Sequence, residues 1–174
     1  MTERVFNFGA GPAVLPFVVL EQIREHFPSL PGLGMSVLEI SHRSKAFADI
    51  LSVAETNVRE LAELSADYHV LFLQGGATQQ FSMVPMNLLP NQGVADYVIT
   101  GSWAKKATEE AKKFGSVRVS ASTESENYTR VPGAGELNQN VDAAYLHITS
   151  NNTIYGTQWS SMPTTNGVPL VVDA

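Results

Sequence analysis

The sequence predicts an α/β protein with three layers, in which a mainly parallel sheet carries helices on both faces. Two observations support this prediction. Apolar residues at helical spacing alternate along the chain with short apolar runs that are typical of buried strands. Strands separated by helices of ten or more residues need crossover connections, and such connections join parallel strands. The order of the strands is not set by this pattern.

Each expected element rests on its local pattern. The clearest helix spans residues 45–64, where seven apolar positions form one continuous stripe. Pro85 is expected to kink a later helix or to end its regular part. A polar stretch, residues 122–139, is expected to cross the surface. The expected helices are residues 17–27, 45–64, 78–89 and 103–114, and the expected strands are residues 68–73, 95–100, 117–121, 143–149 and 170–173.

Composition excludes several classes of protein. The net charge is −6 and the chain has no run of lysine or arginine, so it does not resemble a nucleic-acid-binding protein. There is no cysteine, which excludes disulfides, thiolate metal sites and cysteine nucleophiles. No apolar run approaches the roughly 20 residues of a membrane span. We therefore expect a cytoplasmic protein that binds neither nucleic acid nor membrane, and we predict no metal site.

Polar groups follow several of the expected strands, at the carboxyl ends where ligands bind in such sheets. In residues 73–81, the pair Gly75-Gly76 precedes a helix, and free amides at a helix start favour a phosphate. A simple turn is an equal alternative, because the usual G-x-G-x-x-G and P-loop patterns are absent. Trp103 follows the next strand, where a flat ring can stack on a planar ligand, although tryptophan is more often a core residue.

Two further strand ends and one helix start complete this set. Residues 148–156 are small and polar, which indicates either a turn or hydroxyl and amide groups around a ligand. Asp173 ends an apolar strand, where a carboxylate needs a partner such as an arginine or a cationic ring nitrogen. His42 and Arg43 precede the long helix, where a guanidinium can clamp a carboxylate or phosphate.

Taken together and in this order, these motifs resemble the phosphoserine aminotransferases, which are class V aminotransferases of the fold-type I pyridoxal-phosphate group. The resemblance covers essentially the whole chain. Residues 6–13 are similar to the family's N-F-x-x-G-P-A signature, and residues 34–43 to its G-x-S-V-x-E-x-S-H-R segment. The other matching segments are the glycine turn with Gln80 and Phe81, residues 95–98, residues 101–103, residues 152–156 and residues 171–174.

The resemblance implies a role for each matching position. Gly76, Ala77 and Thr78 would bind the phosphate of pyridoxal 5′-phosphate (PLP), and Trp103 would stack on its ring. Thr153 would reach a polar ring substituent, and Asp173 would keep the ring nitrogen protonated. His42 and Arg43 would bind the anionic end of the substrate.

The family interconverts L-glutamate and 3-phosphohydroxypyruvate with 2-oxoglutarate and O-phospho-L-serine, on the route to serine. Some members also accept a phosphohydroxythreonine substrate. The resemblance further implies a homodimer. The resemblance also divides the chain into two parts: an extended segment, residues 1–16, and the N-terminal part of an incomplete PLP-binding large domain, residues 17–174. The C-terminal small domain would be absent.

The chain departs from the family in two places. Thr78 stands where some members have a substrate-binding arginine, so that contact has to come from elsewhere. The family's Schiff-base lysine lies about two dozen residues beyond the aspartate, and no residue of this chain takes that catalytic role. The chain's lysines are Lys45, Lys105, Lys106, Lys112 and Lys113. We therefore expect a truncated chain that is inactive by itself, whether or not it binds PLP.

Three interpretations remain open. The chain derives from a phosphoserine aminotransferase, or from another class V enzyme such as a serine-glyoxylate-type aminotransferase or a cysteine desulfurase. As a third possibility, it is a non-catalytic fragment that self-associates, since removal of later strands would leave an open sheet edge.

Overall fold

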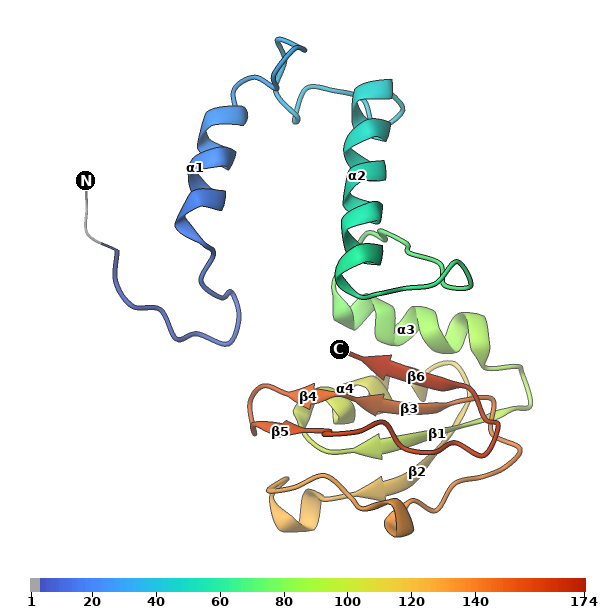
Figure 1. Cartoon of the computed structure of the whole chain (residues 1–174). Coiled ribbons are helices and arrows are strands. Elements are labelled where there is room, and N and C mark those ends of the chain that lie inside the picture. Colours follow the sequence, from blue (N-terminus) through green and yellow to red (C-terminus); the bar gives the residue numbers. More distant parts are fainter. Residues whose placement is uncertain (1–3) are drawn as a thin grey trace. The chain divides into compact units, whose positions relative to one another are not determined.

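A computed structural model describes residues 4–174, and the chain divides into two compact units (Figure 1). One unit runs up to Leu73 and the other runs from Gln74 to Ala174. The sheet and every strand belong to the second unit, which therefore holds most of the features that the sequence singles out.

The first unit contains two helices, α1 (Phe17–His26) and α2 (Lys45–Leu61). Both were predicted, and α2 ends three residues earlier than expected, shortly before Glu63 takes a left-handed backbone conformation (φ 52°). Ser44 caps the start of α2, where its side chain accepts a hydrogen bond from the Phe47 amide at 3.2 Å. Neither helix contains a buried residue within the chain.

The strand predicted at residues 68–73 is not formed. These residues pair with no strand among residues 4–174, and Leu71, Phe72 and Leu73 are all exposed. A short apolar run shows a tendency to be a strand, but a strand exists only where a neighbour supplies the ladder of hydrogen bonds. The described part of the chain provides no such neighbour.

The second unit is built on a four-stranded sheet whose strand order is β2-β1-β3-β6. All three pairings are parallel, as the alternation of helices and strands predicted. The strands are β1 (Val94–Ile99), β2 (Ser116–Ser122), β3 (Leu146–Thr149) and β6 (Leu170–Asp173). A separate antiparallel pair, β4 (Asn151–Asn152) and β5 (Thr157–Gln158), was not predicted.

Helices α3 (Ala77–Leu88) and α4 (Ser102–Ala111) cover one face of the sheet (Figure 1). Pro85 is buried inside α3 and does not end it, because the helix continues to Leu88. On the opposite face, loop residues rather than an α-helix of this unit complete the core around Val98 and Ile148. The cluster on the helical face comprises Phe81, Leu89, Ala95, Tyr97, Ala107, Ala111 and Tyr145.

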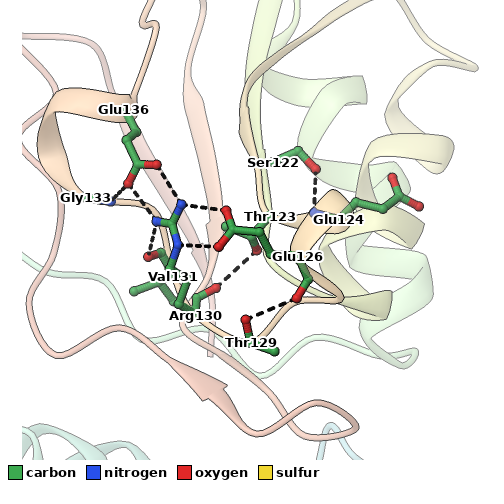
Figure 2. Close-up of polar contacts among 9 residues, drawn as sticks. All are labelled: Ser122, Thr123, Glu124, Glu126, Thr129, Arg130, Val131, Gly133 and Glu136. Carbon is green, nitrogen blue, oxygen red and sulfur yellow. Dashed lines mark hydrogen bonds and ion pairs between the residues drawn. The ribbon is translucent and has the colours of Figure 1, made fainter.

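The polar stretch at residues 122–139 is ordered by one arginine and two glutamates. It contains two short 3-10 helices, Glu124–Glu126 and Ala134–Glu136, and Figure 2 shows Arg130 between them. The guanidinium donates to both carboxylates: to Glu126 at 2.6 and 2.7 Å and to Glu136 at 2.7 and 2.8 Å. These groups are solvent-exposed, so the clamp shapes the loop more than it stabilises the fold.

A second, partly buried ion pair, Asp96–Arg118, connects the end of this polar stretch to the sheet. Asp96, on the central strand β1, is 1% exposed and accepts two hydrogen bonds from Arg118 on β2, at 2.6 and 2.8 Å. Asp96 also accepts from the Asn140 amide at 2.7 Å, and Arg118 donates to the Asn138 carbonyl at 2.6 Å. The buried carboxylate is therefore fully partnered, as a charge in a sheet interior has to be.

Within residues 4–174 no helix is long and apolar enough to cross a membrane, and no group of three potential metal ligands lies together.

Replacing Arg118 with Met should reduce the free energy of unfolding by about 3 kcal/mol, because Asp96 would stay buried without its counter-charge. Urea unfolding followed by circular dichroism measures the change. Arg130→Met is the matched control, since it removes an arginine from an exposed cluster and should have a much smaller effect. Equal losses in the two variants would contradict this assignment of the buried pair.

Candidate functional site

A pocket of about 210 Å³ lies at the carboxyl-end edge of the sheet in the second unit. It brings together four of the residues that the sequence singled out, Ala77, Trp103, Thr153 and Asp173. They come from the start of α3, the start of α4, the turn after β4 and the end of β6. The remaining lining residues are Phe81, Asn151 and Ala174.

The start of α3 lies at this pocket through Ala77. Gly76 precedes the helix, and no side chain caps it among the described residues. Gly75 has φ +91°, a backbone conformation that L side chains rarely adopt, so the turn favours glycine. Ala77 lines the pocket, whereas Gly76 and Thr78, its neighbours in sequence, are not among the lining residues. A helix start of this kind attracts anions.

Trp103 and Thr153 are joined directly, by a hydrogen bond of 3.1 Å from the indole Nε1 to the Thr153 Oγ1. A flat ring and a hydroxyl group thus lie side by side at the pocket wall. The arrangement can stack on a planar ligand and reach a polar group at its edge.

Asn152 holds the Thr153 turn against the end of β1. Its side-chain amide donates to Thr100 Oγ1 at 2.9 Å, and its side-chain oxygen accepts from the Ala104 amide at 3.4 Å. The approach is so close that a Cβ on Gly101 would lie 2.4 Å from Asn152 Cγ. Asn152 has the sequence context of an ordinary turn asparagine, and its role depends on contacts 48 to 52 residues away.

Asp173 is partly buried at the end of the edge strand β6, paired in register with Thr149 of β3. Burial raises the pKa of its carboxyl group above the ordinary value, and the Thr149 hydroxyl opposes this change. The Asp173 carboxylate forms no ion pair with any residue in the described range 4–174. It is a carboxylate suited to a cationic partner that the chain itself does not provide.

His42 and Arg43 lie in the first unit and are not part of this pocket. Both are exposed, and the backbone amide of Arg43 donates to Ser41 Oγ at 3.1 Å, which shapes the turn before α2. Phe81, Asn151 and Ala174 line the pocket but were not predicted as site residues. Each lies in a segment that the sequence singled out, namely the glycine turn with Phe81, residues 148–156 and residues 171–174.

Comparison with known proteins decides the family. A sequence model of the family "Aminotransferase class-V" matches residues 5–174. The chain belongs to the class V aminotransferases. It is 51% identical to the phosphoserine aminotransferase of Herpetosiphon aurantiacus, over 97% of the chain and 47% of that protein. It is 52% identical to that of Desulfosudis oleivorans, over 99% of the chain and 48% of that protein.

Solved structures give the same answer. The phosphoserine aminotransferase of Bacillus circulans subsp. alkalophilus superposes with a TM-score of 0.94 at 45% identity, covering 98% of this chain and 47% of its own. The PLP-bound enzyme of Trichomonas vaginalis superposes with a TM-score of 0.90 at 34% identity, covering 97% and 50%. The mainly parallel fold and the family are thus confirmed, and the chain spans about half the length of these relatives.

Replacing Asp173 with Asn should raise the melting temperature of the chain at pH 7. The pKa of Asp173 is higher in the folded state than in the unfolded state, so its charged form opposes folding. The penalty is absent below the unfolded pKa and fully present above the folded one, so the two melting temperatures should converge near pH 3. Calorimetry across this range measures the difference.

Asp142→Asn is the matched control for this prediction, because Asp142 is exposed and should give no comparable gain. A melting temperature of Asp173→Asn at or below that of the unsubstituted chain at pH 7 would contradict it.

Proposed function

We propose that this chain forms the cofactor-binding part of a phosphoserine aminotransferase. The proposed reaction transfers an amino group between L-glutamate and 3-phosphohydroxypyruvate, with O-phospho-L-serine and 2-oxoglutarate as products. The observation that carries the proposal is the pocket in which Trp103, Thr153, Asp173 and the start of α3 meet. The similarity to phosphoserine aminotransferases over nearly the whole chain supports the choice of reaction.

The donor set of this pocket fits PLP. The uncapped start of α3 offers amide groups at Ala77 and Thr78, together with the Thr78 hydroxyl and the Gly76 turn, to a phosphate. The Trp103 ring provides a stacking surface, and Thr153 provides a hydroxyl group at its edge. When bound, PLP would supply an electron sink for the carbanion that forms at the substrate α carbon.

Asp173 is assigned to the cofactor's ring nitrogen. Its carboxylate lacks a cationic partner among residues 4–174, and burial raises its pKa. A protonated ring nitrogen beside it would be stabilised and would lower that pKa. The charged Asp173 carboxylate opposes folding of the chain alone, but in the pocket it would bind the cofactor's ring nitrogen.

His42 and Arg43 are assigned to the anionic end of the substrate. Both side chains are exposed and neither forms a side-chain hydrogen bond within residues 4–174, so both are available to a carboxylate or phosphate. A guanidinium can bind either group with two parallel hydrogen bonds.

None of the chain's lysines lines the pocket among the described residues. Transamination needs an amine that moves the proton at the substrate α carbon. We therefore propose that residues 1–174 alone bind the cofactor without turning over substrate, and that the activity belongs to a polypeptide of the relatives' full length.

The full-length protein that contains these residues should transfer the amino group of glutamate to 3-phosphohydroxypyruvate, measured as phosphoserine formed. Asp173→Asn in that protein should lower turnover by about 10²–10³-fold, because a fixed charge that stabilises the developing carbanion is lost. The 174-residue chain should show no turnover and, after borohydride reduction with PLP, no adduct on one specific lysine.

Alternative substrates distinguish the proposed reaction from other class V activities. Turnover of glyoxylate with serine, or sulfur release from cysteine, without turnover of 3-phosphohydroxypyruvate would refute the proposed reaction in favour of another class V activity.

We also propose that the chain self-associates, with a second copy covering its exposed apolar surface. On α2, the apolar side chains of Ile50, Leu51 and Val58 are each about 40% exposed, and no residue of that helix is buried. Strand β6 is an edge of the sheet, so its outer hydrogen-bonding groups have no strand partner among residues 4–174. Exposed apolar stripes and open edges of this kind are typical of association surfaces.

Sedimentation velocity at rising concentration should show dimers or larger species. Leu51→Lys combined with Val58→Lys should shift the distribution toward monomer, because charge replaces apolar surface on one face of α2. Ser52→Lys combined with Thr56→Lys adds the same charge without removing apolar surface and should leave it unchanged. A monomer at every concentration would contradict self-association.

A further inference from the structure

The imidazole of His147 is buried beside the candidate site without a hydrogen-bond partner. His147 is 2% exposed on β3, its ring forms no hydrogen bond with any described residue, and its Nδ1 is shielded from solvent. The ring stacks on Tyr97 at 4.7 Å between centroids and meets the edge of Phe81 at 6.3 Å. Buried polar atoms usually have a partner, which is often an ordered water where the protein supplies none.

A cavity suitable for such a water adjoins the ring. It has a volume of about 370 Å³, and its polar side chains are those of Gln80, His147 and Asp173. Its other lining residues are Ala77, Phe81, Val84, Val171, Val172 and Ala174. Three polar side chains line this space, which matches the roughly three hydrogen bonds that a buried water makes.

The sheet register sets the separation of these groups. His147 pairs with Val171 across β3 and β6, and Asp173 lies two residues further along the same face of β6. Such diagonal positions are roughly 8 Å apart at their backbones, which suits a bridge through one water better than a direct contact.

We propose that His147 is a positioning residue for Asp173, and that the two side chains share a buried water with the Gln80 amide. The effect of this bridge on the cofactor rests on the proposed function, since Asp173 is the group assigned to the cofactor's ring nitrogen. The water bridge itself is a property of the chain and does not require the cofactor.

The protonation state of His147 suits this role. Burial lowers its pKa to about 4, so the imidazole is neutral at physiological pH and has one donor and one acceptor nitrogen. It can support the Asp173 carboxylate without adding a positive charge that would compete with a cationic ring nitrogen. The other titratable groups on this face, Tyr97 and Tyr145, are also neutral, because burial raises the pKa of each.

The test is the pKa of Asp173 measured by carboxyl ¹³C NMR in the 174-residue chain, with its signal assigned by Asp173→Asn. His147→Phe keeps a ring against Tyr97 but cannot hydrogen-bond, and it should shift the pKa of Asp173 further upward. His147→Gln keeps a donor and should give a value near that of the unsubstituted chain. Gln80→Leu should shift the pKa in the same direction as His147→Phe.

An Asp173 pKa that is the same in folded His147→Phe and in the unsubstituted chain would overturn the proposal. Should His147→Phe fail to fold, Gln80→Leu gives the answer, because it removes a second side chain that the proposed water contacts. An Asp173 pKa that is the same in folded Gln80→Leu and in the unsubstituted chain would then overturn the proposal. If the Asp173 pKa depends on His147 as expected but the chain does not bind PLP, the proposed function is refuted and this inference stands.

Discussion

The parallel alignment of β1, β3 and β6 is the constraint on which the candidate site depends. Because the three strands run in the same direction, their carboxyl ends reach one edge of the sheet. The chain then places a different group at each end: Trp103 after β1, Thr153 after β3 and the short strand β4, and Asp173 on β6. Three residues separated by up to 70 positions in the sequence become neighbours through backbone pairing alone.

Polar side chains inside the sheet secure this alignment in two places. Asp96 and Arg118 join β1 to β2 and also fasten the backbone at Asn138 and Asn140. Asn152 joins the Thr153 turn to the end of β1 and the start of α4. Asp173 differs from both, because its carboxylate forms no ion pair within residues 4–174 and its burial opposes folding. It is the position at which we propose that a ligand charge binds.

The helices and most strands could be predicted from sequence because their signals are local. Apolar spacing located α1 and α4 to within a few residues, and β6 was predicted at its observed bounds. Prediction failed where structure depends on distant partners. Residues 68–73 have the composition of a strand but no neighbour to pair with, and the β4–β5 pair is too short for any periodic signal.

The same distinction applies to the site. Trp103, Thr153 and Asp173 could be named because each follows a recognisable strand and belongs to a family motif. Asn152 lies in one of these motifs as well, but its role could not be named because its sequence context is that of a turn. His147 could not be named because its context is that of a core strand. Their importance comes from contacts with Thr100, Ala104, Tyr97 and the cavity beside Asp173, all of which require the fold.

The central claim, that these strand ends form a PLP site, is tested most directly by the fluorescence of Trp103. The chain has two tryptophans, so Trp159→Phe leaves Trp103 as the only one. Titration of this variant with PLP should quench its emission saturably, and pyridoxal without the phosphate should bind more weakly because it cannot use the start of α3. Quenching that is not saturable, or that is the same for both compounds, would contradict the account.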